Sequence, residues 1–76
     1  MGVAINLFSE KKYSEAINLL DSIYESHHNK PLLLNIKGAC FAGMNDFNSA
    51  INFYKSAIEI DPKYYKAHYN LAGALH

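Results

Sequence analysis

Residues 13–20 read YSEAINLL, and residues 47–54 read FNSAINFY. The two stretches share an Ala-Ile-Asn core and begin 34 residues apart, at residues 13 and 47. Glu25 and Glu59 are also separated by 34 residues. A fixed period of roughly 20 to 50 residues is typical of proteins built from repeated structural units. The chain is therefore expected to be a repeat protein.

The apolar residues of both stretches recur at helical spacing. They fall at i, i+1, i+4, i+7 and i+8 counted from Ala16 and again counted from Ala50, which puts one apolar stripe along a helix. Pro31 suits the first turn of a helix, the Asn-Asp pair at 45–46 signals a turn, and Pro62 breaks the chain. We predict an all-α fold of about five helices, over residues 2–9, 13–26, 32–44, 47–60 and 64–75.

Residues 31–64 carry a spaced set of side chains typical of one known repeat. In order along the chain, the diagnostic positions hold Leu34, Lys37, Gly38, Phe41, Ala50, Tyr54, Ala57 and Pro62. This unit resembles the tetratricopeptide repeat, whose pattern is W-x2-L-G-x2-Y, then A-x3-F, then P. Leu34 and Lys37 depart from the tryptophan and the leucine of that pattern. The resemblance implies an α-α superhelix of antiparallel helix pairs.

The spacing of small and large residues in this unit has a physical reason. Gly38, Ala50 and Ala57 would let two antiparallel helices approach closely. Phe41 and Tyr54 would fill the space beside them. We expect the closest helix contact of the unit to lie at these positions.

The resemblance divides a single domain, residues 1–76, into three units. Residues 1–30 would be a shortened repeat and residues 31–64 a complete repeat. Residues 65–76 would be the first helix of a further repeat or a capping helix.

The register of the last helix depends on the offset chosen. An offset of 34 pairs Asn70 with Ile36, whereas an offset of 35 pairs it with Asn35. The offset of 34 is preferred because it places Leu71 and Leu75 on the face that packs against the preceding helix.

The composition limits the classes of partner. Seven Lys and Arg residues balance seven Asp and Glu residues, so no basic excess exists to bind nucleic acid or an anionic membrane surface. A single cysteine in 76 residues argues against a disulfide-rich secreted domain. No stretch approaches the roughly 20 apolar residues of a membrane-spanning helix, and no signal peptide is read. We predict a cytoplasmic protein that binds neither nucleic acid nor membrane.

The sequence contains no catalytic, cofactor-binding or metal-binding motif. His27 and His28 are adjacent, so they would not face one way on a helix, and we interpret them as loop residues. His68 takes the place of a helix-packing aromatic and is expected to be half-buried. Cys40 is expected to be a buried thiol and not a nucleophile. We therefore predict that the chain is not an enzyme.

The resemblance places a binding groove on the first helices of successive units. Its residues here would be Ile5 on the first unit, Leu32, Asn35, Ile36 and Ala39 on the second, and Lys66, Tyr69 and Asn70 on the third. One branch of the family clamps the acidic C-terminus of heat-shock chaperones. The five positions of that clamp hold Met1, Ile5, Ile36, Lys66 and Asn70 in this chain. Only Lys66 fits, so a chaperone tail is disfavoured as the partner.

Two functions are compatible with these features. The first is a protein–protein interaction scaffold that binds a peptide or a partner protein through the concave groove. The alternative is a structural or oligomerisation segment of a longer repeat array attached to a larger protein, for example a transferase. After Lys66 no Lys, Arg, Asp or Glu occurs, so self-association into a homo-oligomer by end-to-end packing is also expected. Tyr64, Tyr65 and Tyr69 belong either to a recognition patch or to the packing between repeats.

Overall fold

The computed structural model describes residues 12–75, and these residues form four α-helices. The helices are α2 (Tyr13–Ile23), α3 (Lys30–Gly43), α4 (Phe47–Ile60) and α5 (Tyr65–Leu75). This part of the chain contains no strand, in agreement with the all-α prediction. The helix predicted at residues 2–9 lies outside the described residues.

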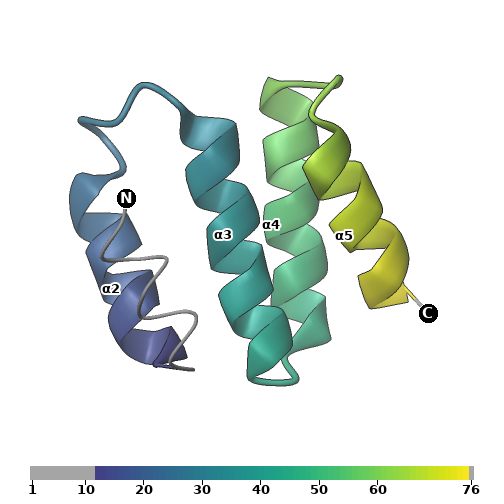
Figure 1. The fold of residues 1–76 in the computed structure, drawn as a ribbon, viewed down its shortest axis with the longest axis horizontal. Coiled ribbons are helices and arrows are strands. Elements are labelled where there is room, and N and C mark those ends of the chain that lie inside the picture. Colours follow the sequence, from purple (N-terminus) through teal and green to yellow (C-terminus); the bar gives the residue numbers. More distant parts are fainter. Residues whose placement is uncertain (1–11, 76) are drawn as a thin grey trace.

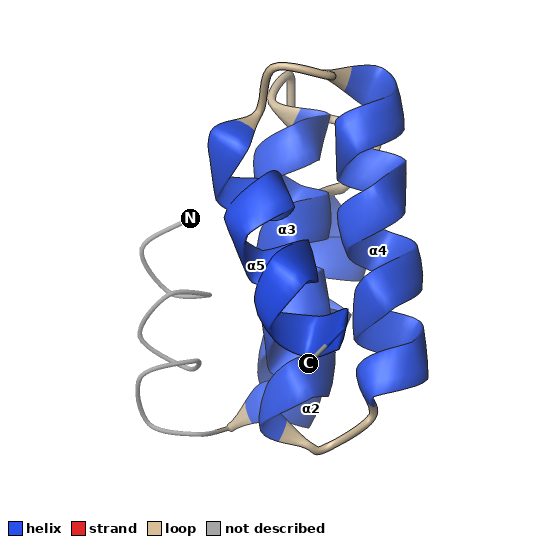
Figure 2. Ribbon diagram, turned by 90° about the vertical axis from the view of Figure 1, so that its right-hand side faces the viewer, coloured by secondary structure: helices blue, strands red, loops and turns tan. Residues whose placement is uncertain are grey.

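Successive helices run antiparallel and lie side by side (Figure 1). α3 packs chiefly on α4 and also on α2, whereas α5 packs on α4 and touches α3. α3 and α5 therefore run in the same direction and lie on the same side of α4 (Figure 2). This arrangement puts the first helix of the predicted complete unit beside the first helix of the next one.

The junction between α2 and α3 is set by side chains at the start of α3. The Asn29 side chain caps α3 by accepting a hydrogen bond from the Leu32 backbone N–H at 3.3 Å. α2 ends at Ile23, three residues before the predicted boundary. Beyond that point the Tyr24 carbonyl accepts from the Lys30 ammonium at 2.8 Å, so this side chain takes the place of a further helical N–H.

The turn between α3 and α4 follows the predicted Asn-Asp signal. Asn45 has a positive φ of 65°, which is the left-handed conformation that asparagine tolerates. Asp46 then caps α4, because its carboxylate accepts from the Ser49 N–H at 3.3 Å and from the Ser49 hydroxyl at 2.8 Å. Local chemistry alone therefore accounts for both ends of this connection.

Two clusters of buried apolar side chains hold the helices together. Leu20 of α2 and Leu33 of α3 form the first cluster. Leu34 of α3, Ala57 of α4 and Ala67 of α5 form the second, which joins three helices. The second cluster positions α5 beside α3.

Gly38 confirms the predicted close approach of α3 and α4. A Cβ atom at Gly38 would lie 2.6 Å from Cε1 of Tyr54 and 3.2 Å from the backbone oxygen of Ala50. Ala50 and Tyr54 are themselves buried. No side chain larger than hydrogen fits there unless the Tyr54 ring or the helices themselves move.

Some buried residues correspond at the offset of 34, whereas Leu34 is buried and its counterpart His68 is exposed. Ala16 and Ala50 correspond at this offset, as do Leu33 and Ala67, and all four are buried. The expectation for Leu75 is wrong, because that side chain is 63% exposed. α5 is held near its first turn by Ala67, and its last turn extends away from the core.

Candidate functional site

The residues predicted to form a groove lie on α3 and α5. On α3, Asn35 is buried, and Leu32, Ile36 and Ala39 are half-buried; on α5, Lys66 and Tyr69 are exposed and Asn70 is half-buried. Ile5 lies outside the described residues. We call the surface formed by the residues on these two helices the α3–α5 face. No enclosed pocket is present within residues 12–75.

The structure brings Asn35 and Asn70 together. Nδ2 of Asn70 donates a hydrogen bond to Oδ1 of Asn35 at 3.0 Å. Asn35 is only 7% exposed, so its side chain is held within the packing of α3 against its neighbours. The sequence placed both residues on one face but gave no sign of the bond between them.

Both amides keep unused hydrogen-bonding capacity. Among the described residues, neither Nδ2 of Asn35 nor Oδ1 of Asn70 makes a further hydrogen bond. No fully buried side-chain nitrogen or oxygen in this part of the chain lacks a partner, so Nδ2 of Asn35, which has none, is not completely enclosed. The pair therefore presents a donor from α3 and an acceptor from α5.

The three tyrosines at the start of α5 divide between the two predicted roles. Tyr64 packs against the cluster of Leu34, Ala57 and Ala67. Burial raises its pKa, and the charges of neighbouring Tyr65 and Asp61 add to this effect. In contrast, Tyr65 and Tyr69 are 72% and 80% exposed, respectively. Tyr69 thus adds an exposed aromatic ring to the turn of α5 that also carries Asn70.

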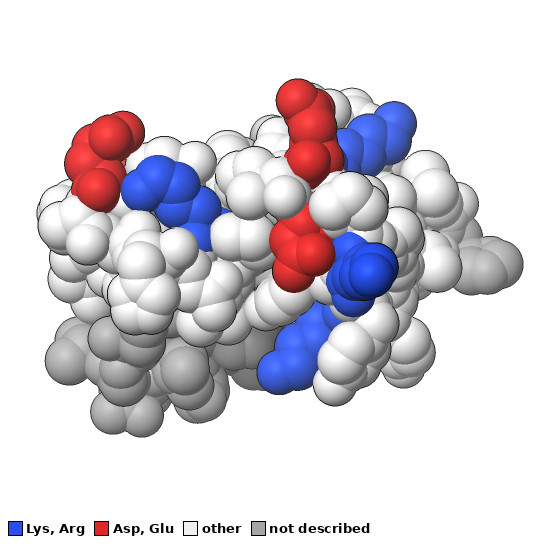
Figure 3. Space-filling view, turned by 90° about the horizontal axis from the view of Figure 1, so that it is seen from above, with Lys and Arg blue, Asp and Glu red and all other residues white. Residues whose placement is uncertain are grey.

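The charge on the α3–α5 face is small. Lys66 is the one charged residue in the set assigned to this face. At the end of the molecule that carries the α2–α3 loop and the α4–α5 turn, acidic and basic side chains are interspersed (Figure 3). Neither surface offers a field of one sign that would attract a strongly charged ligand.

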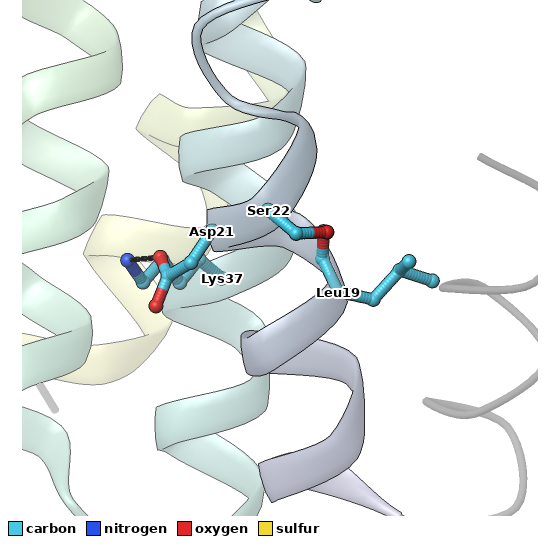
Figure 4. Close-up of polar contacts among 4 residues, drawn as sticks. All are labelled: Leu19, Asp21, Ser22 and Lys37. Atoms are coloured by element: carbon cyan, nitrogen blue, oxygen red, sulfur yellow. Dashed lines mark hydrogen bonds and ion pairs between the residues drawn. The ribbon is translucent and has the colours of Figure 1, made fainter.

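Lys37, which replaces the leucine of the repeat pattern, joins three helices. Its ammonium forms an ion pair with Asp21 of α2 (Figure 4). The same ammonium lies 4.8 Å from the centre of the Phe53 ring of α4, and Phe53 stacks on Phe41 at 5.3 Å between ring centres. Sequence reasoning missed this arrangement, because neither partner is near Lys37 in the chain.

The candidate reactive side chains have structural partners. Nδ1 of His27 accepts a backbone N–H at 3.1 Å, and its ring stacks on that of His28. The prediction of a half-buried His68 is wrong: the residue is exposed, with Nε2 at 2.8 Å from the carbonyl oxygen of Pro62. Cys40 is fully buried as predicted, and burial raises the pKa of its thiol.

Two further features are absent from the described part of the chain. Residues 12–75 contain no group of three or more His, Cys, Asp or Glu side chains placed to hold a metal ion. None of the four described helices is both long and apolar enough to cross a bilayer.

Comparison with known proteins finds similarity to one family. A family model of the TPR repeat matches residues 41–76. The small glutamine-rich tetratricopeptide repeat-containing protein 2 of Mycosarcoma maydis is 36% identical over 67 residues, covering 88% of this chain and 19% of that protein. The peroxisomal targeting signal receptor of Kluyveromyces lactis is 28% identical over 72 residues, covering 95% of this chain and 13% of the receptor.

The chain thus spans less than a fifth of the length of these curated relatives. No solved structure matches it significantly. The repeat model, the relatives and the all-helical fold agree with the diagnostic residues of the sequence. The chain belongs to the tetratricopeptide repeat family.

Proposed function

We propose that this chain is a non-catalytic protein-interaction module that binds an extended peptide, or a segment of a partner protein, along the α3–α5 face. The pair of Asn35 and Asn70 is the observation that carries the proposal. A donor and an acceptor held side by side match the N–H and C=O of a peptide main chain.

The surroundings of the amide pair support the same ligand. Leu32, Ile36 and Ala39 offer half-buried apolar surface along α3, and the exposed Tyr69 ring offers the kind of contact common in protein interfaces. With Lys66 as the one charge in this set, the favoured ligand is a peptide with apolar side chains and little net charge.

The relatives support a role in protein recognition. One of them is named as a receptor for a peroxisomal targeting signal and the other as a tetratricopeptide repeat-containing protein. Because the chain matches only a small part of either protein, the class of its own partner is inferred from the chemistry of the α3–α5 face and not from these names.

A displayed library of random linear peptides tests the proposal. The peptide retained most strongly would be synthesised and titrated by calorimetry against the wild-type chain, Asn70→Ala and the control Asn52→Ala, which removes an exposed asparagine of α4. We expect Asn70→Ala to weaken binding about five- to tenfold, the effect of one hydrogen bond, and the control to change nothing. Failure to retain any peptide, or equal affinity for all three chains, would contradict the proposal.

A peptide with the acidic chaperone tail should not bind measurably. Of the clamp positions in the described residues, Ile36 and Asn70 carry no positive charge and only Lys66 does. Calorimetric titration at low ionic strength is the most permissive measurement, because low salt favours charge–charge contacts. A dissociation constant in the micromolar range would contradict this prediction and show that the chain binds an acidic tail.

A second candidate function is assembly with copies of the same chain. The exposed Tyr65, Tyr69 and Leu75 on α5 favour it, because large apolar side chains left in solvent are typical of interfaces. We propose self-assembly as the alternative. A molecular mass that increases with protein concentration would distinguish it from peptide binding.

A further inference from the structure

We infer that Asn35 is a positioning residue, which orients the Asn70 amide so that its Oδ1 atom faces a bound main chain. The inference rests on the proposed function, since it assigns a polarity to the same face.

Asn35 is suited to this role because it is the more deeply buried member of the pair. Its side chain is 7% exposed and lies within the packing of α3, whereas Asn70 is half-buried and close to solvent. A free asparagine amide can turn over and exchange its oxygen with its nitrogen. In this chain the Nδ2 atom of Asn70 is held at 3.0 Å from the Asn35 oxygen, which leaves Oδ1 of Asn70 directed away from the bond.

The hydrogen bond gives the pair a polarity. Oδ1 of Asn70 offers an acceptor on the α5 side, and Nδ2 of Asn35 offers a donor on the α3 side. In an extended strand, the N–H and C=O of one residue point to the same side and bind one neighbour together. A peptide residue would therefore place its N–H toward α5 and its C=O toward α3, which sets the direction of the bound chain.

The orientation of Asn70 is testable without any ligand. In nuclear magnetic resonance spectra of the wild-type chain, one Nδ2 proton of Asn70 should exchange slowly and show a small temperature coefficient. The exposed amides of Asn48 and Asn52 serve as internal controls. Asn35→Ala should abolish the protection, while Asn35→Asp, which keeps an acceptor, should retain it. An Asn70 amide in the wild-type chain that behaves like the two controls overturns the inference, whether or not the variants fold.

The binding arm uses the peptide selected from the random library. Asn70→Ala should weaken binding about five- to tenfold, and Asn35→Ala should weaken it further, because it removes the Nδ2 donor and also releases the Asn70 amide. The double variant should be about as weak as Asn35→Ala, and not as weak as the two losses multiplied, because Asn70 acts through Asn35. Methylating the peptide N–H that contacts Asn70 should lower affinity for the wild-type chain but not for Asn70→Ala. Additive losses in the double variant would overturn the inference. If the library yields no peptide, the proposed function fails, while the amide signals still decide the role of Asn35.

Discussion

The contact between Gly38 and Tyr54 shows how one residue sets the distance between two helices. The tyrosine ring lies against the backbone of α3 where any other residue would place a Cβ atom. Gly73 on α5 lies in open space instead, because a Cβ there would meet nothing within 4 Å. Two glycines of one chain thus have opposite constraints.

Gly38→Ala should lower the free energy of unfolding by about 1–3 kcal/mol, because the added methyl group overpacks the site between Tyr54 and Ala50. Gly73→Ala is the matched control and should raise that free energy by up to about 1 kcal/mol, since alanine favours the helix and meets no neighbour. Urea denaturation followed by far-ultraviolet dichroism measures both. Equal effects of the two substitutions would mean that α3 and α4 do not approach as described.

Alkaline pH should destabilise the fold through two buried acids. Burial raises the pKa of the Cys40 thiol above its ordinary 9.0, and burial together with the charge of Cys40 raises the pKa of the Tyr54 phenol above 10.0. The folded chain therefore holds these protons more tightly than the unfolded chain does. The resulting stabilisation is complete below the ordinary values and is lost as the pH rises through the raised ones.

Urea midpoints measured between about pH 8 and pH 11 should accordingly fall for the wild-type chain. The decline should be shallower in Cys40→Ala and in Tyr54→Phe, each of which removes one titrating group. A slope unchanged in both variants would assign the alkaline loss to other groups.

At the scale of the helix, the first residue of α3 closes the end of α2. The ammonium of Lys30 donates to the carbonyl oxygens of Tyr24 at 2.8 Å and of His27 at 3.2 Å, and it lies 4.7 Å from the centre of the Tyr24 ring. A cation at a helix C-terminus also meets the negative end of the helix dipole. The two helices are therefore joined by a side chain as well as by their loop.

Lys30→Met should lower the free energy of unfolding by roughly 1 kcal/mol, because it leaves the carbonyl oxygens of the α2 terminus without their donor. Lys55→Met removes an exposed lysine of α4 and should have little effect. Hydrogen exchange gives the local readout: the His27 N–H, which bonds to the Ile23 carbonyl at 3.0 Å, should exchange faster in Lys30→Met only. Similar exchange in both variants would show that Lys30 does not hold the junction.

At the scale of the whole molecule, the exposed side of α5 is the proposed contact between copies of the chain. Tyr65, Tyr69 and Leu75 are exposed on this helix, and no charged residue follows Lys66. An apolar surface of this kind is commonly covered by another protein surface. The α5 helix thus serves both the proposed peptide-binding face and the proposed contact between copies.

Light scattering at several protein concentrations should show a mass that increases with concentration. Leu75→Lys should shift the chain toward the monomer, because it places a charge in the apolar surface, whereas Asn52→Lys adds the same charge to α4 and should not. A monomer at every concentration, unaffected by Leu75→Lys, would leave peptide binding as the sole proposed role of α5.

The sequence by itself determined where the described helices lie along the chain. The recurrence of apolar residues after Ala16 and Ala50 and the caps at Asn29 and Asp46 act within a few residues of chain, so the bounds of α4 agree with prediction and those of α3 and α5 lie within two residues of it. The closeness of Gly38 to the opposite helix was also predictable, because the repeat pattern records that contact in its residue types.

Only the tertiary structure decided which side chains meet. The bond between Asn35 and Asn70, the ion pair of Lys37 with Asp21 and the exposure of Leu75 depend on how far each helix is rotated and displaced against its neighbours. The periodicity of apolar residues indicates which side of a helix is buried. It does not determine the exact rotation of the helix about its axis or the residues that its side chains contact. Partners separated by 16 or 35 residues are therefore selected by packing across helices, which no local pattern encodes.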